Sequence, residues 1–414
     1  MEIVQEICKW IVIVLSVYSA PLMIWTLISA LNGTRKLKER APIEDKQHDF
    51  AVIICARNEE NVLPNLLKSL QRQEYAGKHD VFVVADNCTD ATASVAAKHG
   101  ATVFVRNNDK EVGKGYALQY GIDKLMTDYS DKYDAICVFD ADNLAASNFL
   151  SEMNATLCSG VEVAQGYRDT KNVHDSWLSE TYTVYWLMLT RYYHAARANM
   201  GLSSMVGGTG FAFKTSCLEN GKWNTHSLTE DVEFSIQQIT RGNSITLAYK
   251  AVFYDEQPTT MTVSVKQRLR WIKGNIQCIP LCLPGIVKQV FKGNLKCLDL
   301  AWYLLFIPAS GIALPLNVLT LLTLALNPTT VSFALPMFLL GAAAAYVVSA
   351  IVAYSTLRME KKDLKAMRRA VLLYPFFILT TTMIAFVALI RPKMEWVPIK
   401  HESKYSIEEI EAGQ

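Results

Sequence analysis

The placement of charged residues limits the fold of this chain more than any other feature, because three long stretches carry no charge. One lies between Lys9 and Arg35, another between Asp299 and Arg358, and the last covers residues 370–390. A helix needs about 20 apolar residues to cross the hydrocarbon core of a membrane. We therefore predict four spanning helices, with "NPTT" (327–330) as the turn between the middle two. The predicted spans are residues 11–30, 300–325, 331–354 and 371–390.

Two basic segments orient these spans. "RKLKER" (35–40) follows the first span and "RMEKKDLKAMRR" (358–369) precedes the last, and Lys and Arg gather on the cytoplasmic side of membranes. The first run is too long for a signal peptide and lacks a clear small-residue cleavage site. We predict a multi-pass protein of the plasma membrane with a cytoplasmic middle region. A crossing over 371–390 would place the basic tail outside, so an interfacial or re-entrant helix is the alternative there.

Charge and cysteine content narrow the function classes. The net charge of +2 over 414 residues is too small to suggest a nucleic-acid partner. The nine cysteines form no CxxC pair and no Cys/His metal spacing. Cys55, Cys88 and Cys137 lie in or beside apolar runs, so we interpret them as small core residues of a protein in a reducing compartment.

The region between the first two spans alternates strand-like and helix-like segments. Strands are predicted over 50–56, 80–87, 101–106 and 134–143, and helices over 60–73, 91–100 and 115–126. This alternation indicates an α/β, Rossmann-like domain with a mostly parallel sheet and helices on both faces. We divide the chain into residues 1–40 (first span and basic flank), 41–258 (the α/β domain), 259–297 (interfacial helices) and 298–414 (remaining spans and tail).

Carboxylates at strand ends mark the expected ligand site, because open α/β sheets bind ligands at the carboxyl ends of their strands. Asp86 ends one predicted strand, and Asp140 and Asp142 end another within "FDADN". Neither a GxGxxG fingerprint nor a GxxxxGK[ST] loop is present. If a nucleotide binds at this edge, no glycine-rich loop of either type is present to hold its diphosphate. The negative charge of the diphosphate would instead be neutralised by cationic side chains, or by Mg²⁺ or Mn²⁺ bound to the two aspartates. An ordinary acidic turn is the alternative.

A second acidic cluster, "HSLTEDVEFS" (226–235), opens a predicted helix. Ser227 and Glu230 fit a capping box, with Ser227 as the N-cap and Glu230 at N3. Asp231 lies beside Glu230, and a neighbouring carboxylate raises a pKa while a helix N-terminus lowers it. Asp231 could therefore take a proton from an alcohol as a bond forms. Favourable charge at a helix N-terminus is the alternative for Asp231.

Two further segments fit a ligand site. The glycines of "GGTGFAFK" (207–214) permit close backbone approach to a ligand, or else form a tight turn. "SVKQRLRWIKG" (264–274) carries four cations and a tryptophan just before an uncharged run. Such residues anchor helices at a membrane surface. Alternatively, Gln267, Arg270 and Trp271 hold a phosphate and stack on a sugar, while other cations meet lipid headgroups. Those other cations are Lys266, Arg268 and Lys273.

The chain resembles a membrane-integrated family 2 glycosyltransferase of GT-A fold. The motifs that carry the resemblance are, in chain order, "ARNEE", "VVADNCTD", "GKGYAL", "FDADN", "GGTGFAF", "TEDVEF" and "QRLRW". The resemblance covers roughly residues 48–275. Within this family, the chain is similar to the processive synthases of poly-N-acetylglucosamine, hyaluronan and cellulose. Asn87 stands where many members have a second acidic residue, which puts one uridine contact in doubt.

The resemblance implies a role for each matching position. UDP-sugar binding is implied for Ala56, Arg57, Glu59, Asp86, Lys114, Asp140, Gln267 and Arg270. Metal binding is implied for Asp142 with Asp140, and general-base catalysis for Asp231 beside Glu230. Acceptor binding is implied for Trp271, Gly208 and Thr209.

The expected activity is that of an inverting, processive hexosyltransferase. It would polymerise UDP-glucose or UDP-N-acetylglucosamine into a β-linked extracellular polysaccharide, with Mg²⁺ or Mn²⁺ as cofactor, and export the product. The expected partners are the donor, the growing polysaccharide, membrane lipids, and a second copy or an accessory membrane subunit. A non-processive enzyme that adds one sugar to a lipid-linked acceptor is the alternative. A transporter or receptor is disfavoured, because the predicted spans carry no charge.

Overall fold

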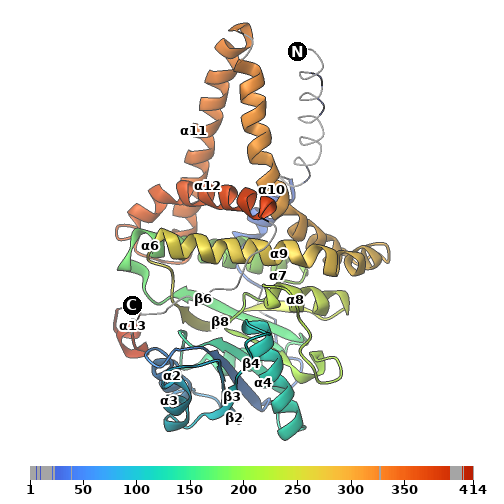
Figure 1. Ribbon diagram of the computed structural model, residues 1–414, viewed down its shortest axis with the longest axis vertical. Coiled ribbons are helices and arrows are strands. Elements are labelled where there is room, and N and C mark those ends of the chain that lie inside the picture. The colour runs from blue at the N-terminus through green and yellow to red at the C-terminus, as the bar shows by residue number, and fades with distance from the viewer. Residues whose placement is uncertain are drawn as a thin grey trace.

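The computed structural model of the chain describes residues 24–38, 40–325, 328–391, 403 and 405–413, with the isolated positions 6, 10 and 21. Most of the predicted first span, 11–30, lies outside these residues, and the part inside them belongs to the apolar helix Ile24–Gly33. A sheet domain forms one end of the molecule, and a helical hairpin projects from the other end (Figure 1). A layer of helices that run across the hairpin lies between the two.

One eight-stranded sheet organises the domain, in the order β3-β2-β1-β4-β7-β6-β8-β5. The strands are β1 (Phe50–Ala56), β2 (His79–Asp86), β3 (Thr102–Arg106), β4 (Ala135–Asp140), β5 (Leu144–Ala145), β6 (Val163–Thr170), β7 (Phe211–Lys214) and β8 (Ile245–Asp255). The first four are parallel to one another, which confirms the prediction for that half. β7 is antiparallel to both neighbours, so the sheet is mixed.

Helices cover both faces of the sheet, as predicted. They are α2 (Leu63–Gln71), α3 (Thr92–Lys98), α4 (Lys114–Asp128), α5 (Phe149–Leu157) and α8 (Glu230–Thr240). Alternate residues of β1 enter two separate cores: Ile53 joins the core under α4 and α8, and Val52 and Ile54 join the core under α2 and α5. Because both faces are buried, the strand is apolar throughout rather than alternating, which is why it could be recognised in the sequence.

The antiparallel β7 has a consequence for the ligand site. Phe211, its first residue, pairs with Val138 of β4. The glycine-rich loop that leads into β7 therefore lies at the end of β4, where Asp140 and Asp142 follow. Two motifs about 70 residues apart in the sequence are thereby neighbours at one sheet edge.

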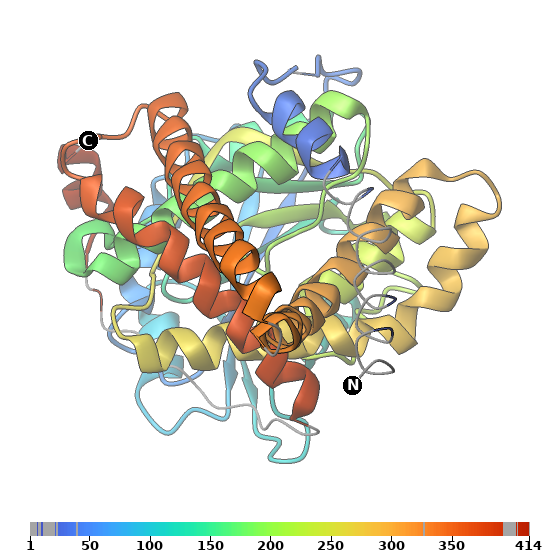
Figure 2. The ribbon, with the colours of Figure 1, turned by 90° about the horizontal axis from the view of Figure 1, so that it is seen from above.

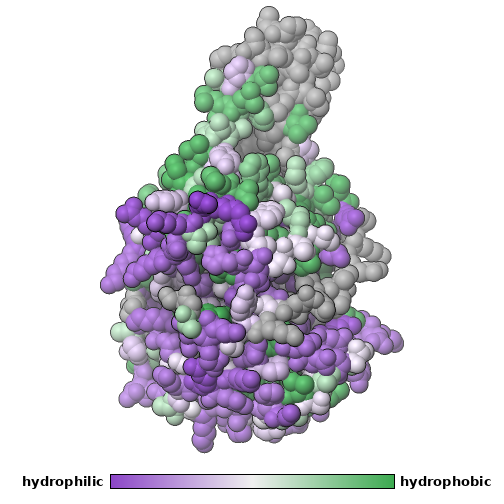
Figure 3. Space-filling view, turned by 90° about the vertical axis from the view of Figure 1, so that its left-hand side faces the viewer, coloured by the Kyte–Doolittle hydropathy of each residue, from purple (hydrophilic) through white to green (hydrophobic). Residues whose placement is uncertain are grey.

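Long helices form the layer and the hairpin above the sheet. They are α6 (Trp177–Met188), α7 (Ala196–Met200), α9 (Met261–Val290), α10 (Leu295–Ala325), α11 (Pro328–Met359) and α12 (Arg368–Ile390). Three helical windows among the described residues are long and apolar enough to cross a membrane: Leu295–Ile312, Leu335–Met359 and Arg368–Ile390. Hydrophobic residues cover most of the coloured part of the hairpin of α10 and α11, and hydrophilic residues cover much of the sheet domain (Figure 3).

The predicted fourth span forms a helix, but that helix does not run alongside the hairpin. α12 lies across the base of α10 and α11 in both perpendicular views (Figures 1 and 2), and it contacts α6 and α9. Its neighbours in the helical layer hold it: Arg268 of α9 donates to Thr380 Oγ1 (2.9 Å) and Thr381 Oγ1 (2.8 Å). α12 therefore does not run parallel to α10 and α11, and this position fits the interfacial alternative for residues 371–390.

The chain then returns to the sheet domain. Ser406 precedes α13 (Ile407–Gly413), whose Ile407 is buried against Leu144 and Tyr254. Arg72 of α2 donates to Glu408 (2.7 Å) and Glu411 (3.3 Å). α13 consequently lies against the sheet domain, on the same side of the hairpin as the sheet.

Candidate active site

The glycine-rich loop brings the predicted base to the end of β4. Gly208 and Gly210 have φ angles of +82° and +60°, which side chains rarely tolerate. A Cβ atom on Gly208 would lie 3.3 Å from Asp231 Oδ2. The backbone of the loop thus lies directly against the carboxylate of Asp231, in the first turn of α8.

Lys114, the first residue of α4, connects this loop to the aspartate pair. Its Nζ donates to the carbonyl of Gly208 (2.6 Å) and to Asp140 Oδ1. Burial opposes the charge of Lys114, but Asp140 and Glu230 raise its pKa above the usual value. The ammonium group is therefore held charged where a diphosphate would need a cation.

Buried Glu230 and half-buried Asp231 form an acidic pair. Burial, and then the charge of Asp231, raises the pKa of Glu230, and burial also raises the pKa of Asp231. Hydrogen bonding at the helix start and the charges of Lys114 and Arg168 oppose the rise at Asp231. A carboxylate of raised pKa is a stronger base than an exposed one, which suits proton abstraction from a hydroxyl.

The predicted capping box is wrong. The N-cap of α8 is Thr229, and Glu230 is the first helical residue rather than N3. Glu233 does the local capping instead, since its Oε2 accepts from the backbone N–H groups of His226 (2.8 Å) and Ser227 (2.7 Å). The side chain of Glu230 lies against Gly115, where an added Cβ atom would be 3.2 Å from Glu230 Cβ.

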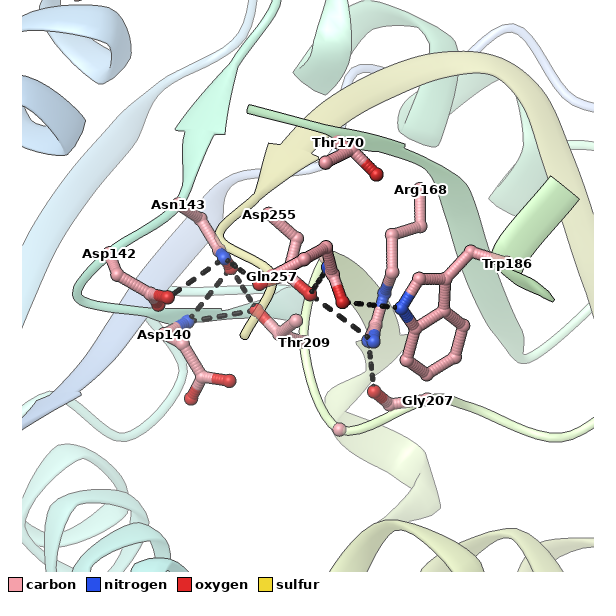
Figure 4. Close-up of polar contacts among 12 residues, drawn as sticks. Asp140, Asp142, Asn143, Arg168, Thr170, Trp186, Gly207, Thr209, Asp255 and Gln257 are labelled. Atoms are coloured by element: carbon pink, nitrogen blue, oxygen red, sulfur yellow. Dashed lines mark hydrogen bonds and ion pairs between the residues drawn. The ribbon is translucent and has the colours of Figure 1, made fainter. Parts of the chain in front are cut away.

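The two aspartates of "FDADN" sit in a polar network (Figure 4). Thr209 Oγ1 accepts from the backbone N–H of Asp140 (2.8 Å) and also contacts Asn143. Asn143 donates to Asp142 Oδ1 (3.4 Å) and to Asp255 Oδ1 (2.8 Å). Thr209 is 2% exposed, so its side chain orders the aspartate turn. The prediction that it binds the acceptor is therefore not supported by its position.

Asp140 and Asp142 fit a Mg²⁺ or Mn²⁺ ion by the chemistry of their donor atoms. Two carboxylates at the end of β4 give hard oxygen ligands and leave other positions for phosphate oxygens and water. Lys171 Nζ donates to the backbone carbonyl of Asp142 (2.7 Å), which fixes the turn behind the carboxylates. Asp142 itself is 4% exposed.

The end of β2 and the end of β1 adjoin the same edge. Ala56 pairs with Ala85, so the predicted nucleotide residues Arg57, Glu59 and Asp86 follow adjacent strands. Asp86 is buried and accepts from Arg106 Nη1 (2.7 Å). Arg106 was not predicted, although its position at the end of β3 carries the same strand-end signal as the aspartates.

Helix α9 carries "QRLRW" over this edge. Gln267 Oε1 and Arg270 Nε are buried and have no hydrogen-bond partner among the described residues, which fits groups that await a polar ligand. Trp271 packs into an aromatic cluster with α6 and α12. The expectation that Arg268 and Lys273 reach lipid headgroups is wrong. Arg268 is 3% exposed, and Lys273 Nζ donates to the carbonyl of Ala388 in α12 (3.1 Å), so both side chains bind α12. Lys266 is exposed, as that expectation requires.

A glycine sets the distance between α9 and the acidic pair. A Cβ atom on Gly274 would lie 2.8 Å from the backbone nitrogen of Thr229 and 2.5 Å from its Cγ2. Gln277 Oε1 also accepts from the backbone N–H of Leu228 (2.9 Å). The start of α8 and the middle of α9 therefore touch, and the charge of Arg270 acts on Glu230.

Comparisons with known proteins agree with this geometry. Residues 48–274 match the family model described as "Glycosyltransferase like family 2". The chain is 26% identical over 234 residues to the probable glycosyltransferase YdaM of Bacillus subtilis, with 54% of each chain covered. It is 26% identical to a beta-monoglucosyldiacylglycerol synthase of Nostoc, covering 55% of this chain and 49% of the relative. It is 25% identical to a poly-beta-1,6-N-acetyl-D-glucosamine synthase of Staphylococcus aureus, covering 56% and 55%.

The chain spans about half the length of these curated relatives. Among solved structures, a mannosyltransferase from Pyrobaculum calidifontis in complex with GDP-Man and Mn²⁺ superposes with a TM-score of 0.57 at 16% identity. The match covers 89% of this chain and 98% of that one, so the likeness includes helices outside the sheet domain. At this identity the likeness shows a shared fold.

Proposed function

This chain is a family 2 glycosyltransferase, and on that premise we propose that it transfers a hexosyl group from a UDP-sugar to a saccharide hydroxyl at a membrane surface. The observation that carries the proposal is that the glycine-rich loop contacts both the cation Lys114 and the predicted base Asp231. Gly208 contacts Lys114 through its carbonyl and lies against Asp231. A cation for the leaving diphosphate and a base for the incoming hydroxyl are therefore fixed relative to each other.

The reaction is a single displacement. Asp231 takes the proton of the acceptor hydroxyl as its oxygen bonds to C1 of the donor sugar, and the bond from C1 to the diphosphate oxygen breaks. The configuration at C1 inverts, because no carboxylate forms a covalent intermediate. Lys114 and Arg270 meet the negative charge of the departing UDP. A divalent ion on Asp142 and Asp140 would, when bound, neutralise the same diphosphate.

The growing end of a polysaccharide is the acceptor that the aromatic residues favour. Trp271 and Trp186 lie 5.6 Å apart between ring centroids. Gln267 and Arg270, on the same helix as Trp271, each carry a buried polar atom that has no hydrogen-bond partner among the described residues. Aromatic rings next to free hydrogen-bonding groups suit a sugar ring, which has apolar C–H faces and polar edges. One relative is named for making such a polymer.

A lipid-linked acceptor that receives one sugar is the second candidate, and the hairpin favours it. An apolar 18-residue window of α11, long enough to cross a membrane, contains no buried residue, and α10 and α11 diverge toward the sheet domain (Figure 1). Within the described residues of one copy, this stretch of α11 therefore supplies no buried lining for a polymer path. Export of a polysaccharide would need a second copy or a partner subunit to complete such a path.

Product length distinguishes these candidates. Purified protein in detergent would be given Mn²⁺ and a panel of UDP-sugars, with UDP-glucose and UDP-N-acetylglucosamine first, and the released UDP would be measured. A high-mass product on a gel supports repeated transfer, and a single glycolipid band supports the second candidate. Failure to release UDP with every donor, with and without membrane lipids, contradicts the proposed function.

Replacing Asp142 by asparagine should raise the Mn²⁺ concentration for half-maximal activity by at least about tenfold, because one of two carboxylate ligands loses its charge. The measurement is a Mn²⁺ titration of UDP release. Asp109→Asn, in the exposed loop after β3, is the matched control and should leave the titration unchanged. Equal titrations for Asp142→Asn and wild type would remove Asp142 from the metal site.

The position of α12 predicts the membrane topology. A C-terminal reporter should lie on the same side of the membrane as the sheet domain, since α13 docks on α2. In intact bacteria, a cysteine placed at Asn327, between α10 and α11, should react with a membrane-impermeant maleimide, and one at Gln414 should react only after lysis. Labelling of position 414 in intact cells would show that α12 crosses the membrane.

A further inference from the structure

Two half-buried tryptophans from different helices meet at the edge of the site. Trp186 of α6 and Trp271 of α9 have ring centroids 5.6 Å apart and ring planes at 70°. Neither ring is fully buried, whereas their neighbours Tyr182 and Phe377 are 0% and 1% exposed. Part of each tryptophan packs in the cluster, and the remaining surface is accessible to a ligand.

The orientation of Trp186 is fixed from two sides. Its Nε1 donates to Gln257 Oε1 (2.9 Å), and the guanidinium of Arg168 lies 3.9 Å from its ring centroid. Figure 4 shows the indole of Trp186 alongside Arg168, whose guanidinium also binds the carbonyl of Gly207. A tryptophan locked in this way loses little further entropy when a ligand binds.

Arg168 connects this tryptophan to the reacting groups. Its Nη2 donates to the carbonyl of Gly207, the residue before the Gly208 that lies against Asp231. Its Nη1 lies 3.4 Å from Asp255 Oδ2, and Asp255 accepts from Asn143. A ligand that contacts Trp186 therefore lies close to the glycine-rich loop, which lies against Asp231.

From this arrangement we propose that Trp186 is a second acceptor-binding residue, which forms with Trp271 an aromatic corner for one pyranose ring of the acceptor. Arg168 and Gln257 are positioning residues that hold Trp186. The two ring planes are steeply inclined, so one indole can stack on a sugar face while the other contacts its edge. This inference rests on the proposed function and adds that the acceptor is recognised as a sugar.

Binding of labelled oligosaccharides tests the corner without requiring turnover. Fluorescein-labelled β-linked tetrasaccharides of glucose and of N-acetylglucosamine would be titrated with full-length protein in detergent, with UDP and Mn²⁺ present, and followed by anisotropy. Trp186→Leu should weaken binding of the preferred tetrasaccharide by at least about tenfold. Trp186→Phe keeps a ring but loses the bond to Gln257, and should fall between Trp186→Leu and wild type.

Trp177→Leu is the matched control, because Trp177 is half-buried in the same cluster at the other end of α6. It should leave binding unchanged, and UDP affinity should be equal in all variants. Equal tetrasaccharide affinity of wild type and both Trp186 variants overturns the inference, as does failure of wild type to bind either tetrasaccharide. If only the proposed function is wrong, the wild-type protein would still bind a tetrasaccharide but would release no UDP from any UDP-sugar.

Discussion

Asp231→Asn is expected to lower the rate of sugar transfer by about 10²–10⁴-fold while UDP binding stays intact, because the amide cannot accept the proton of the acceptor hydroxyl. The structure gives two reasons for this choice of base. Asp231 is the carboxylate in contact with the glycine loop, and burial raises its pKa. The measurement is kcat for UDP release, together with the Kd of UDP by calorimetry.

Glu230→Gln separates the two carboxylates. Glu230 faces Gly115 and Lys114 rather than the loop, so its amide variant should keep measurable transfer. If Glu230→Gln lost as much activity as Asp231→Asn, or if Asp231→Asn kept near wild-type kcat, Asp231 would not be the base.

The pH dependence has a definite sign. The base acts only when deprotonated, so activity should fall on the acidic side at a higher pH than an ordinary aspartate would require. Because the pKa of Asp231 in the folded state is raised, the ionised group costs stability above that pKa, and this cost disappears below its unfolded value. Asp231→Asn should therefore have a Tm equal to or above wild type at neutral pH, with the difference vanishing in acid. A large loss of Tm would indicate a structural role instead.

Gly274→Ala should lower activity by about 100-fold or more, because a displacement of about 1 Å between reacting groups has that effect. The added methyl would fall 2.8 Å from the backbone nitrogen of Thr229. That backbone cannot rotate away as a flexible side chain could, so α9 must shift relative to α8. Arg270 and Trp271 move with α9, and Asp231 stays with α8. Steady-state kinetics for donor and acceptor would measure the loss.

The same helix supplies the control. Gly285 lies in α9, and a Cβ there would meet no atom within 4 Å. Gly285→Ala should keep full activity and gain about 0.5–1 kcal/mol of stability, because alanine is the better helix former. Comparable losses in both variants would show that α9 itself, rather than its contact with Thr229, is sensitive.

Much of the architecture could be predicted because it depends on local pattern. The strand over 50–56 is apolar throughout because both faces of the sheet are buried, and it was predicted with the bounds that the structure shows. Asp86 and Asp140 end their strands, so parallel pairing alone brings them to one edge. The uncharged runs predicted long helices, since apolar length is a property of sequence.

Side-chain partners could not be predicted, because they come from segments distant in the chain. Thr209 looked available for an acceptor, but Asn143 and Asp140 engage its hydroxyl. Ser227 and Glu230 have the spacing of a capping box, yet Glu233 reaches back to that turn and α8 starts later. Spacing indicates which bonds are sterically possible, and competition among neighbours decides which of them form.

The sequence by itself determined the alternating strands and helices over 50–143, the long apolar helices, and which motifs carry chemistry, because periodicity and residue type are local. Only the tertiary structure decided the direction of α12 and the surroundings of Trp186. The apolar length of α12 allows it to cross a membrane, but Arg268 and Lys273 bind it along α9. Trp186 lies in a helix with no motif, and only the folding of β6, β8 and α9 around it brings Arg168, Gln257 and Trp271 to its ring.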